Sequence, residues 1–311
     1  VLQIAEYKPS PFVRQCYCPS SFYLSLQVKR GKDKKRVQKV IELSKEVDVV
    51  VNCIGLSPRI EGEEGDRFNS HIPAGDKLDL LLPKAQLELI HELDTIDTPI
   101  VTILVSGSAL DLHKLSAQSH AIIQAFYPGQ DGGLAVAELL YGIYSPSGRL
   151  PVTFVDRVED LPHFHDYSMN NRTYKYSNKV PQYPFGYGLS YTYFTYTQLT
   201  MKEEINHYTI SVSIQNSGNY DGIEVVQAYV SSDIKEYPNF KLVFFQHVEL
   251  LKLEVKEISF NISKSQFAMY NEDGLEELRK GNYYLHIGGH QPDTKSEELT
   301  KQKTMMIKIV I

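Results

Sequence analysis

The chain has 311 residues, of which 42% are hydrophobic and 23% charged, and it carries a formal net charge of −6. These proportions exclude a disordered polymer and are typical of a folded chain of two domains. The acidic balance argues against nucleic acid or an anionic membrane as the main partner, since both need a concentrated basic face. The three cysteines, Cys16, Cys18 and Cys53, show neither a disulfide framework nor metal-ligand spacing, so we expect no metal and no other cofactor.

The first half of the chain alternates between helical and strand-like segments. Residues 1–35 carry few periodic signals and are expected to be irregular. A β-branched run over 48–55 predicts a strand buried on both faces, with Cys53 as a small buried hydrophobe. Apolar periodicity and Gly or Pro boundaries predict the other elements. They are helices over 35–47, 83–94 and 132–142, and strands over 98–107, 120–129 and 148–154.

This alternation predicts a mostly parallel sheet sandwiched by helices over residues 36–160, an α/β fold. In such a sheet, the loops at the carboxyl ends of the strands build the ligand site. The loops after Gly55, Val105 and Phe126 fall at these ends. We therefore expect these three loops to lie close together.

The second half of the chain has a different pattern. Residues 161–196 hold eight tyrosines, which makes them too aromatic for ordinary disorder and predicts an ordered linker. Residues 197–311 alternate apolar and polar positions in seven or so short runs separated by turn residues. No helical stretch stands out among them, so they predict an all-β sandwich.

An acidic loop follows the first strand of the α/β region. It places Glu61, Glu63, Glu64 and Asp66 next to Arg67. Crowded carboxyls can raise the pKa of one group while holding another ionised, which is what paired acid and base chemistry needs. From composition alone, a solvated surface loop explains the same residues.

Several motifs occur in a fixed order along the chain. They are GLSPRIEGEEGDR (55–67), FYPGQDGG (126–133), SPSGRLPVTF (145–154), YPFGYGLSYTYF (183–194) and GNYYLHIGGHQPD (281–293). In this order they resemble the C-terminal half of family 3 glycoside hydrolases of the β-xylosidase and β-glucosidase kind, over about residues 36–295. The resemblance implies that the α/β sandwich is the C-terminal domain of that family and that the β-sandwich is a fibronectin type III-like domain.

The resemblance also implies a function. In that family a preceding (β/α) barrel carries an Asp nucleophile, and the α/β domain adds a loop with the acid/base Glu. No segment of this chain matches a barrel, so we expect the nucleophile on a barrel in the same polypeptide or in another chain. The chain is then part of an exo-acting retaining β-glycosidase that removes terminal β-xylosyl or β-glucosyl residues from β-linked oligosaccharides or glycosides. An extracellular or periplasmic location follows from the family's usual substrates.

By this resemblance the acid/base is Glu61 or Glu63, with a slight preference for Glu61 because it stands first after the strand-end loop. Asp66 and Arg67 would hold the loop by a charge-assisted pair. Ser106 and Ser108 could offer hydroxyls to the sugar, although a plain strand-end turn explains them equally well.

Two other classes of protein remain open. The chain could be a non-catalytic carbohydrate-binding or scaffold protein derived from such an enzyme. It could also be a peptide-binding adhesion protein, but that hypothesis rests on the β-sandwich and leaves the acidic loop unexplained. A barrel encoded upstream in the same reading frame would favour the enzyme.

Overall fold

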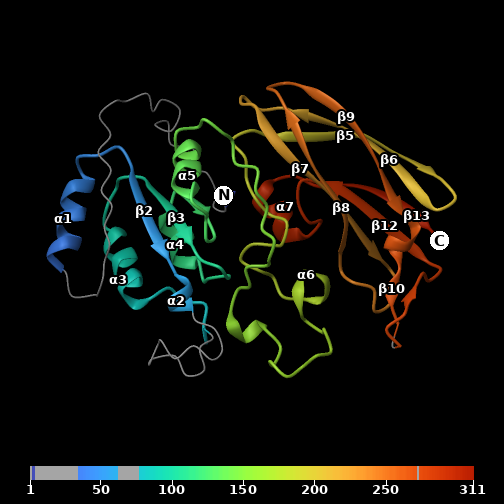
Figure 1. Cartoon of the computed structure of the whole chain (residues 1–311), viewed down its shortest axis with the longest axis horizontal. Coiled ribbons are helices and arrows are strands. Elements are labelled where there is room, and N and C mark those ends of the chain that lie inside the picture. The colour runs from blue at the N-terminus through green and yellow to red at the C-terminus, as the bar shows by residue number, and fades with distance from the viewer. Residues whose placement is uncertain (1, 4–33, 62–76, 272) are drawn as a thin grey trace. The chain divides into compact units, whose positions relative to one another are not determined.

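The computed structural model describes residues 2–3, 34–61, 77–271 and 273–311 (Figure 1). The chain divides into two compact units. Unit 1 comprises residues 1–143 with 154–158, and unit 2 comprises 144–153 with 159–311. Nearly all of the expected irregular segment, 1–35, lies outside the described residues. Within the described ranges, no helix combines the length and hydropathy that a bilayer crossing requires.

Unit 1 is built on a four-stranded sheet in the order β1-β4-β3-β2. Strands β2 (Val50–Gly55), β3 (Ile100–Val105) and β4 (Ala121–Gln124) are parallel, and β1 (Leu2–Gln3) pairs antiparallel with β4. The helices are α1 (Lys34–Ser44), α2 (Pro58–Glu61), α3 (Lys84–Leu93), α4 (His113–Gln118) and α5 (Gly132–Leu140).

Helices cover both faces of this sheet, as Figure 1 shows. On one face, Val40 of α1 and Leu89 and Leu93 of α3 pack with Ile100 of β3. On the other face, α5 packs against a cluster that includes Ile103. The predicted α/β fold with a mostly parallel sheet is therefore confirmed. The short helices α2 and α4 were not predicted, because segments of four and six residues are too short to show apolar periodicity.

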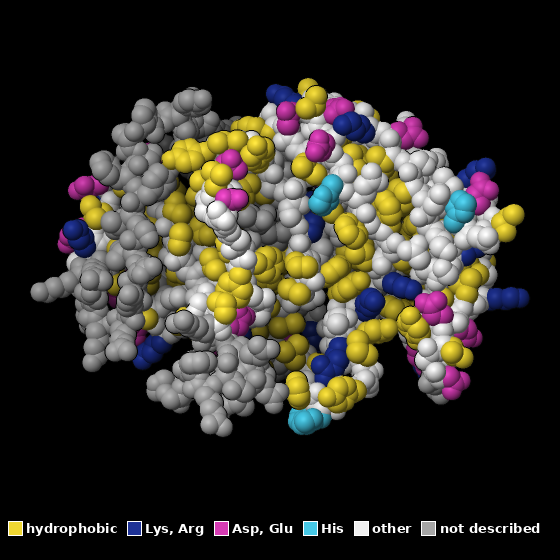
Figure 2. Space-filling model, viewed as in Figure 1, with side chains coloured by type: hydrophobic (Ala, Val, Ile, Leu, Met, Phe, Trp, Pro, Cys, Tyr) yellow, Lys and Arg dark blue, Asp and Glu magenta, His cyan; other side chains and the backbone are white. Residues whose placement is uncertain are grey.

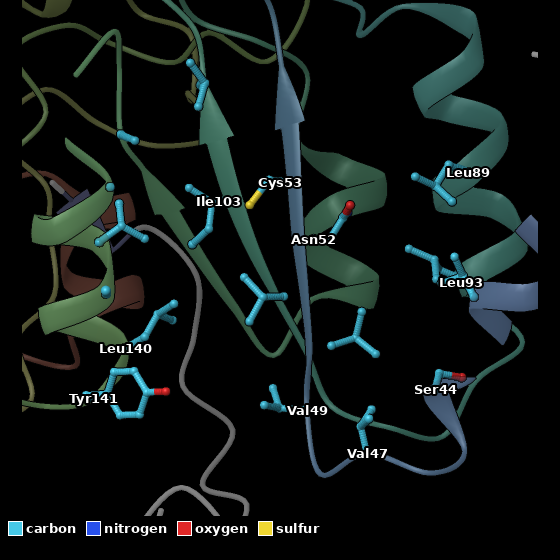
Figure 3. A pocket seen from close by; sticks show the side chains of 18 of the residues that line it. Ser44, Val47, Val49, Asn52, Cys53, Leu89, Leu93, Ile103, Leu140 and Tyr141 are labelled. Carbon is cyan, nitrogen blue, oxygen red and sulfur yellow. The ribbon is translucent and has the colours of Figure 1, made fainter. Parts of the chain in front are cut away.

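The strand that was predicted to be buried on both faces is β2, and for Cys53 that prediction is wrong. Among the described strands, β2 is the last on its side of the sheet, and the Cys53 side chain is exposed. Figure 3 shows Asn52 on the side of α3 and Cys53 on the opposite side, beside Ile103. A cavity of about 510 Å³ runs along this edge and touches both faces. The edge position, which the local sequence does not encode, explains the difference.

Gly55 ends β2 with a φ of +140° in a very tight space. A Cβ atom there would lie 1.9 Å from the carbonyl oxygen of Val105. We expect Gly55→Ala to lower the free energy of unfolding by about 3–5 kcal/mol, since backbone strain and overpacking add. Urea unfolding measures this loss. Gly142→Ala is the matched control, because Gly142 has a φ of +70° but no atom of the described residues within 4 Å of an added Cβ. Equal losses in the two variants would contradict the steric explanation.

Unit 2 contains two main antiparallel sheets. One holds β5 (Phe194–Glu203), β6 (His207–Asn216) and β9 (Val255–Ser263) in the order β5-β6-β9. The other holds β7 (Gly222–Ser232), β8 (Lys241–Leu250), β12 (Asn282–Gly288) and β13 (Met305–Val310) in the order β13-β12-β7-β8. Their inward-facing aliphatic residues form one core cluster, which includes Ile210, Val226 and Leu285. The predicted β-sandwich is confirmed.

Several small elements complete unit 2. A short ribbon joins β10 (Met269–Tyr270) to β11 (Glu276–Glu277). The helix α7 (Thr294–Thr300) is capped by Asp293, whose side chain accepts a hydrogen bond from the Ser296 amide at 2.9 Å. This helix was not predicted, because its seven residues are mostly polar and show no apolar stripe. Single turns η3 (Lys264–Phe267) and α6 (Thr173–Tyr176) also belong here, whereas η2 (Val158–Asp160) lies where the two units divide.

The short strand predicted over 148–154 is wrong. The Leu150 amide donates to the Tyr187 carbonyl at 2.8 Å, and the Leu150 carbonyl accepts from the Gly186 amide at 2.8 Å. Pro151 has no amide hydrogen and cannot continue such a ladder. The segment therefore makes this local pairing without forming a continuous strand.

The Tyr-rich linker lies within unit 2, where it buries some of its aromatic residues and exposes others. Tyr183 and Tyr187 are buried, with ring centroids 5.7 Å apart. Phe164 and Tyr167, in contrast, are 79% and 82% exposed. On the face drawn in Figure 2, acidic and basic side chains of the described residues are interspersed over unit 2.

Candidate functional site

The loops after β2, β3 and β4 converge on one carboxylate, that of Glu61. Glu61 ends α2, directly after β2. The turn after β3 brings Gly107 and Ser108 to it, and the loop after β4 brings Tyr127. The expectation that these three strand-end loops lie together therefore holds for the residues that the structure describes.

Three donors share the two oxygens of Glu61. The Gly107 amide donates to Oε2 at 3.1 Å, and the Tyr127 hydroxyl donates to the same oxygen. The Ser108 hydroxyl donates to Oε1. Because the donors come from the turn after β3 and the loop after β4, the carboxylate holds these segments together at the end of β2.

The backbone before Glu61 is also fixed. The Gln86 side chain of α3 accepts a hydrogen bond from the Gly55 amide at 2.9 Å and donates one to the Gly55 carbonyl at 2.7 Å. The Leu56 amide then donates to the Val105 carbonyl at 2.6 Å, which extends the pairing of β2 with β3 by one residue. The Glu61 amide donates a hydrogen bond to the Ser57 carbonyl at 2.9 Å, which completes the single turn of α2. The position of the carboxylate is thus set from the end of β2.

Gly107 lets the turn after β3 approach both partners closely. A Cβ atom there would lie 2.7 Å from a ring carbon of Tyr127 and 3.1 Å from Oε2 of Glu61. A larger residue would therefore require the Tyr127 ring to shift.

A lysine completes the cluster. The Lys77 ammonium donates to the Ser108 hydroxyl and to the Ala109 carbonyl, each at 3.1 Å. Burial lowers the pKa of Lys77, and the neighbouring Glu61 carboxylate partly opposes that shift. The sequence did not single out Lys77, because one lysine in a polar loop gives no signal.

The electrostatics favour the ionised form of Glu61. Burial by itself raises the pKa of this carboxyl. Hydrogen bonds from Ser108, Tyr127 and Gly107 lower it, as does the positive charge of Lys77, and the pKa ends below its usual value. Burial and the bond to Glu61 raise the pKa of Tyr127 to about 12, so its hydroxyl stays a donor. Glu61 is therefore poised as a carboxylate acceptor.

The other predicted site residues divide into two groups. Glu63, Asp66 and Arg67 lie outside the described residues, as does Glu64. Ser106 is fully buried, and its hydroxyl donates to the Ser108 carbonyl at 2.9 Å and accepts from Gln124 at 3.2 Å. These two hydrogen bonds use the Ser106 hydroxyl to stabilise the turn after β3.

The cavity beside β2 is chemically different from the Glu61 cluster. Among the residues that the structure describes, its lining is mostly aliphatic and contains no carboxylate or basic side chain. These lining residues therefore offer no group for acid and base work. In the described part of the chain, no group of three or more His, Cys, Asp or Glu side chains is arranged to hold a metal ion.

Comparisons with known families match both units. Residues 8–191 match the model of the glycosyl hydrolase family 3 C-terminal domain. Residues 224–291 match the model of a fibronectin type III-like domain. These are the two domains that the motif order had suggested.

Curated relatives include a xylan 1,4-β-xylosidase of Xylanibacter ruminicola, 32% identical over 85% of this chain and 31% of that protein. A periplasmic β-glucosidase of Salmonella typhimurium is 30% identical over 81% of this chain and 34% of its own length. The chain thus spans about a third of these relatives.

Solved structures give the same result. A β-glucosidase from Kluyveromyces marxianus, in complex with glucose, matches 91% of this chain and 34% of its own, with a TM-score of 0.76 and 25% identity. A β-glucosidase from Erythrobacter marinus matches 92% of this chain with a TM-score of 0.73 and 28% identity. The chain belongs to glycosyl hydrolase family 3 and carries its C-terminal α/β domain followed by a fibronectin type III-like domain.

Proposed function

We propose that this chain supplies the acid/base loop of an exo-acting retaining β-glycosidase that removes terminal β-xylosyl or β-glucosyl residues. One observation carries the proposal: the ends of three parallel strands meet at Glu61, and the chain continues from there directly into the sequence Gly62-Glu63. A carboxyl group next to a fixed strand-end cluster is where an α/β domain can present an acid to a ligand. The names of the relatives support the substrate class.

Retaining hydrolysis needs two carboxyl groups about 5–5.5 Å apart, on either side of the glycosidic bond. One carboxylate attacks the anomeric carbon while the other group gives its proton to the leaving oxygen, so that one C–O bond forms as another breaks. The second group then takes a proton from water, whose oxygen displaces the enzyme carboxylate from the sugar. The acid is the group that we assign to this chain.

Between the two candidates, we assign the acid/base role to Glu63. A general acid must hold its proton near neutral pH, which requires a raised pKa. Glu61 has a lowered pKa and three donors on its oxygens. An ionised Glu61 has no proton to give, so it fits a structural role at the start of the loop better than the role of proton donor. The slight preference for Glu61, which rested on sequence order alone, therefore gives way to Glu63. The Asp66–Arg67 pair stays in the proposal as a support of the loop.

The nucleophile is assigned to a (β/α) barrel in the same polypeptide or in a separate chain. The curated relatives are about three times as long as the segment they share with this chain, which leaves room for such a domain. An extracellular or periplasmic location is part of the same proposal, supported by the periplasmic name of the Salmonella relative.

The direct test compares the 311-residue chain alone with the same chain joined to its barrel. Aryl β-xylosides and β-glucosides should be hydrolysed at a negligible rate by the chain alone and readily by the combined protein, because only the latter has both carboxyls. Release of the aryl alcohol measures the rate. Rapid hydrolysis of these glycosides by the chain alone would contradict the proposal. A combined protein that binds the sugar without hydrolysing it would favour the non-catalytic alternative.

A further inference from the structure

Lys77 and Glu61 stand at the two ends of one loop and meet at the same residue. Residues 62–76 connect them in the sequence. The Ser108 hydroxyl accepts a hydrogen bond from the Lys77 ammonium at 3.1 Å and donates its own hydrogen to Glu61. A serine hydroxyl has one hydrogen to give and can also accept, so this pairing uses it in both senses.

We propose that these three residues form an anchor, called here the Ser108 anchor (Glu61, Lys77 and Ser108), which fixes both ends of the acid loop to the turn after β3. Lys77 then acts as a positioning residue for proton transfer by Glu63. This inference rests on the proposed function for its catalytic part, but the anchor itself can be tested without it.

Three observations support the Ser108 anchor. First, Lys77 also donates to the Ala109 carbonyl at 3.1 Å, so its ammonium is attached to the turn at two points. Second, the Asp111 amide bonds the Leu80 carbonyl at 2.7 Å, which ties the chain just after Lys77 to the segment that follows the same turn. Third, the charges of Glu61 and Lys77 are opposite and half-buried around one hydroxyl, so the loss of one leaves the other partly desolvated and unpaired.

The position of the loop ends matters for catalysis because proton transfer is sensitive to distance. A displacement of about 1 Å in a positioning group can lower a rate about 100-fold. The attack of the nucleophile depends much less on the acid when the leaving group departs without protonation. Misplacement of the acid therefore lowers the rate selectively for poor leaving groups.

The first experiment measures hydrogen exchange of the 311-residue chain. In Lys77→Met, peptides that cover residues 106–109 should exchange faster by about tenfold, because Glu61 no longer stays on the Gly107 amide, while β4 peptides keep their rates. Lys77→Arg should restore slow exchange. Lys241→Met is the matched control: Lys241 is also partly buried, with a pKa lowered by burial, and donates to the Ala268 carbonyl at 2.9 Å in unit 2. Unchanged exchange at 106–109 in Lys77→Met overturns the anchor.

The second experiment uses the enzyme with its barrel and compares methyl with 2,4-dinitrophenyl glycosides. Lys77→Met should lower kcat/KM about 10- to 100-fold for the methyl glycosides and less than about threefold for the dinitrophenyl glycosides. Lys241→Met should change neither. Equal losses on both substrates overturn the positioning role. Glu63→Gln is run in parallel: if it shows no selectivity for the leaving group, the proposed function fails, while the exchange result still decides on the Ser108 anchor.

Discussion

Glu63→Gln, in the enzyme that includes the barrel, is expected to lower kcat/KM for methyl β-glycosides by about 10²–10⁴-fold. Glutamine keeps the size of the side chain but removes the proton that the leaving oxygen needs. With 2,4-dinitrophenyl glycosides the first step should be nearly unchanged, since that leaving group departs without protonation. The second step should then limit the rate, because water has lost its base. Steady-state kinetics on both substrates, with a pre-steady-state burst on the second, measure these effects.

Glu61→Gln is the informative comparison, since both residues belong to the same acidic loop. Its loss should be smaller than that of Glu63→Gln and, as in Lys77→Met, larger for the methyl than for the dinitrophenyl glycosides, because the variant weakens the cluster that positions the loop but leaves the proton donor in place. It should also leave Lys77 without its neighbouring negative charge. Leaving-group selectivity in Glu61→Gln, together with none in Glu63→Gln, would reverse our assignment of the two residues.

The sequence predicted which strand-end loops lie together but not the contacts among them. The strand-end rule was enough to bring Glu61, the first residue of the acidic loop, and the turn after β3 together, since it depends only on the order of parallel strands. The ionised state of Glu61 was beyond the sequence, because it depends on hydroxyls that two other loops contribute. Lys77 was missed for the same reason: only the folded chain places it on Ser108.

The fold was predictable where patterns were long. Helices α1, α3 and α5 and most of the longer sandwich strands follow from apolar periodicity or alternation. Cys53 was misjudged because a β-branched strand has the same local sequence at the centre and at the edge of a sheet. The helix α7 was missed because its signal is the capping side chain of Asp293 rather than any apolar stripe.

A buried ion pair in unit 2 explains one motif that the site does not use. Arg149, from the segment SPSGRLPVTF, contacts the Glu224 carboxylate at 3.1 Å, and the two side chains are only 10% and 5% exposed. Arg149 also donates to the Gly289 carbonyl at 3.0 Å. The guanidinium thus joins the motif to β7 and to the end of β12.

Arg149→Met should therefore destabilise unit 2 strongly. The expected loss is about 3–5 kcal/mol, because the Glu224 carboxylate stays buried without a cation. Methionine has a similar length, so loss of packing contributes little. Urea unfolding, followed through the tyrosine signal of the sandwich core, measures the change. Arg149→Met combined with Glu224→Gln should recover part of the loss, since the second change removes the uncompensated charge.

The control for this prediction is an ion pair of the same type on the surface of the sandwich. Lys202 and Glu204 lie 2.7 Å apart, but their side chains are 78% and 36% exposed. Lys202→Met should change the stability little, because water solvates the carboxylate that remains. If Arg149→Met has as small an effect as Lys202→Met, the arginine of this motif is not what holds the segment to the sandwich. The two backbone bonds of Leu150 to residues 186–187, together with the contacts of the Ser145 hydroxyl with Ser190 and Tyr191, would then carry the attachment.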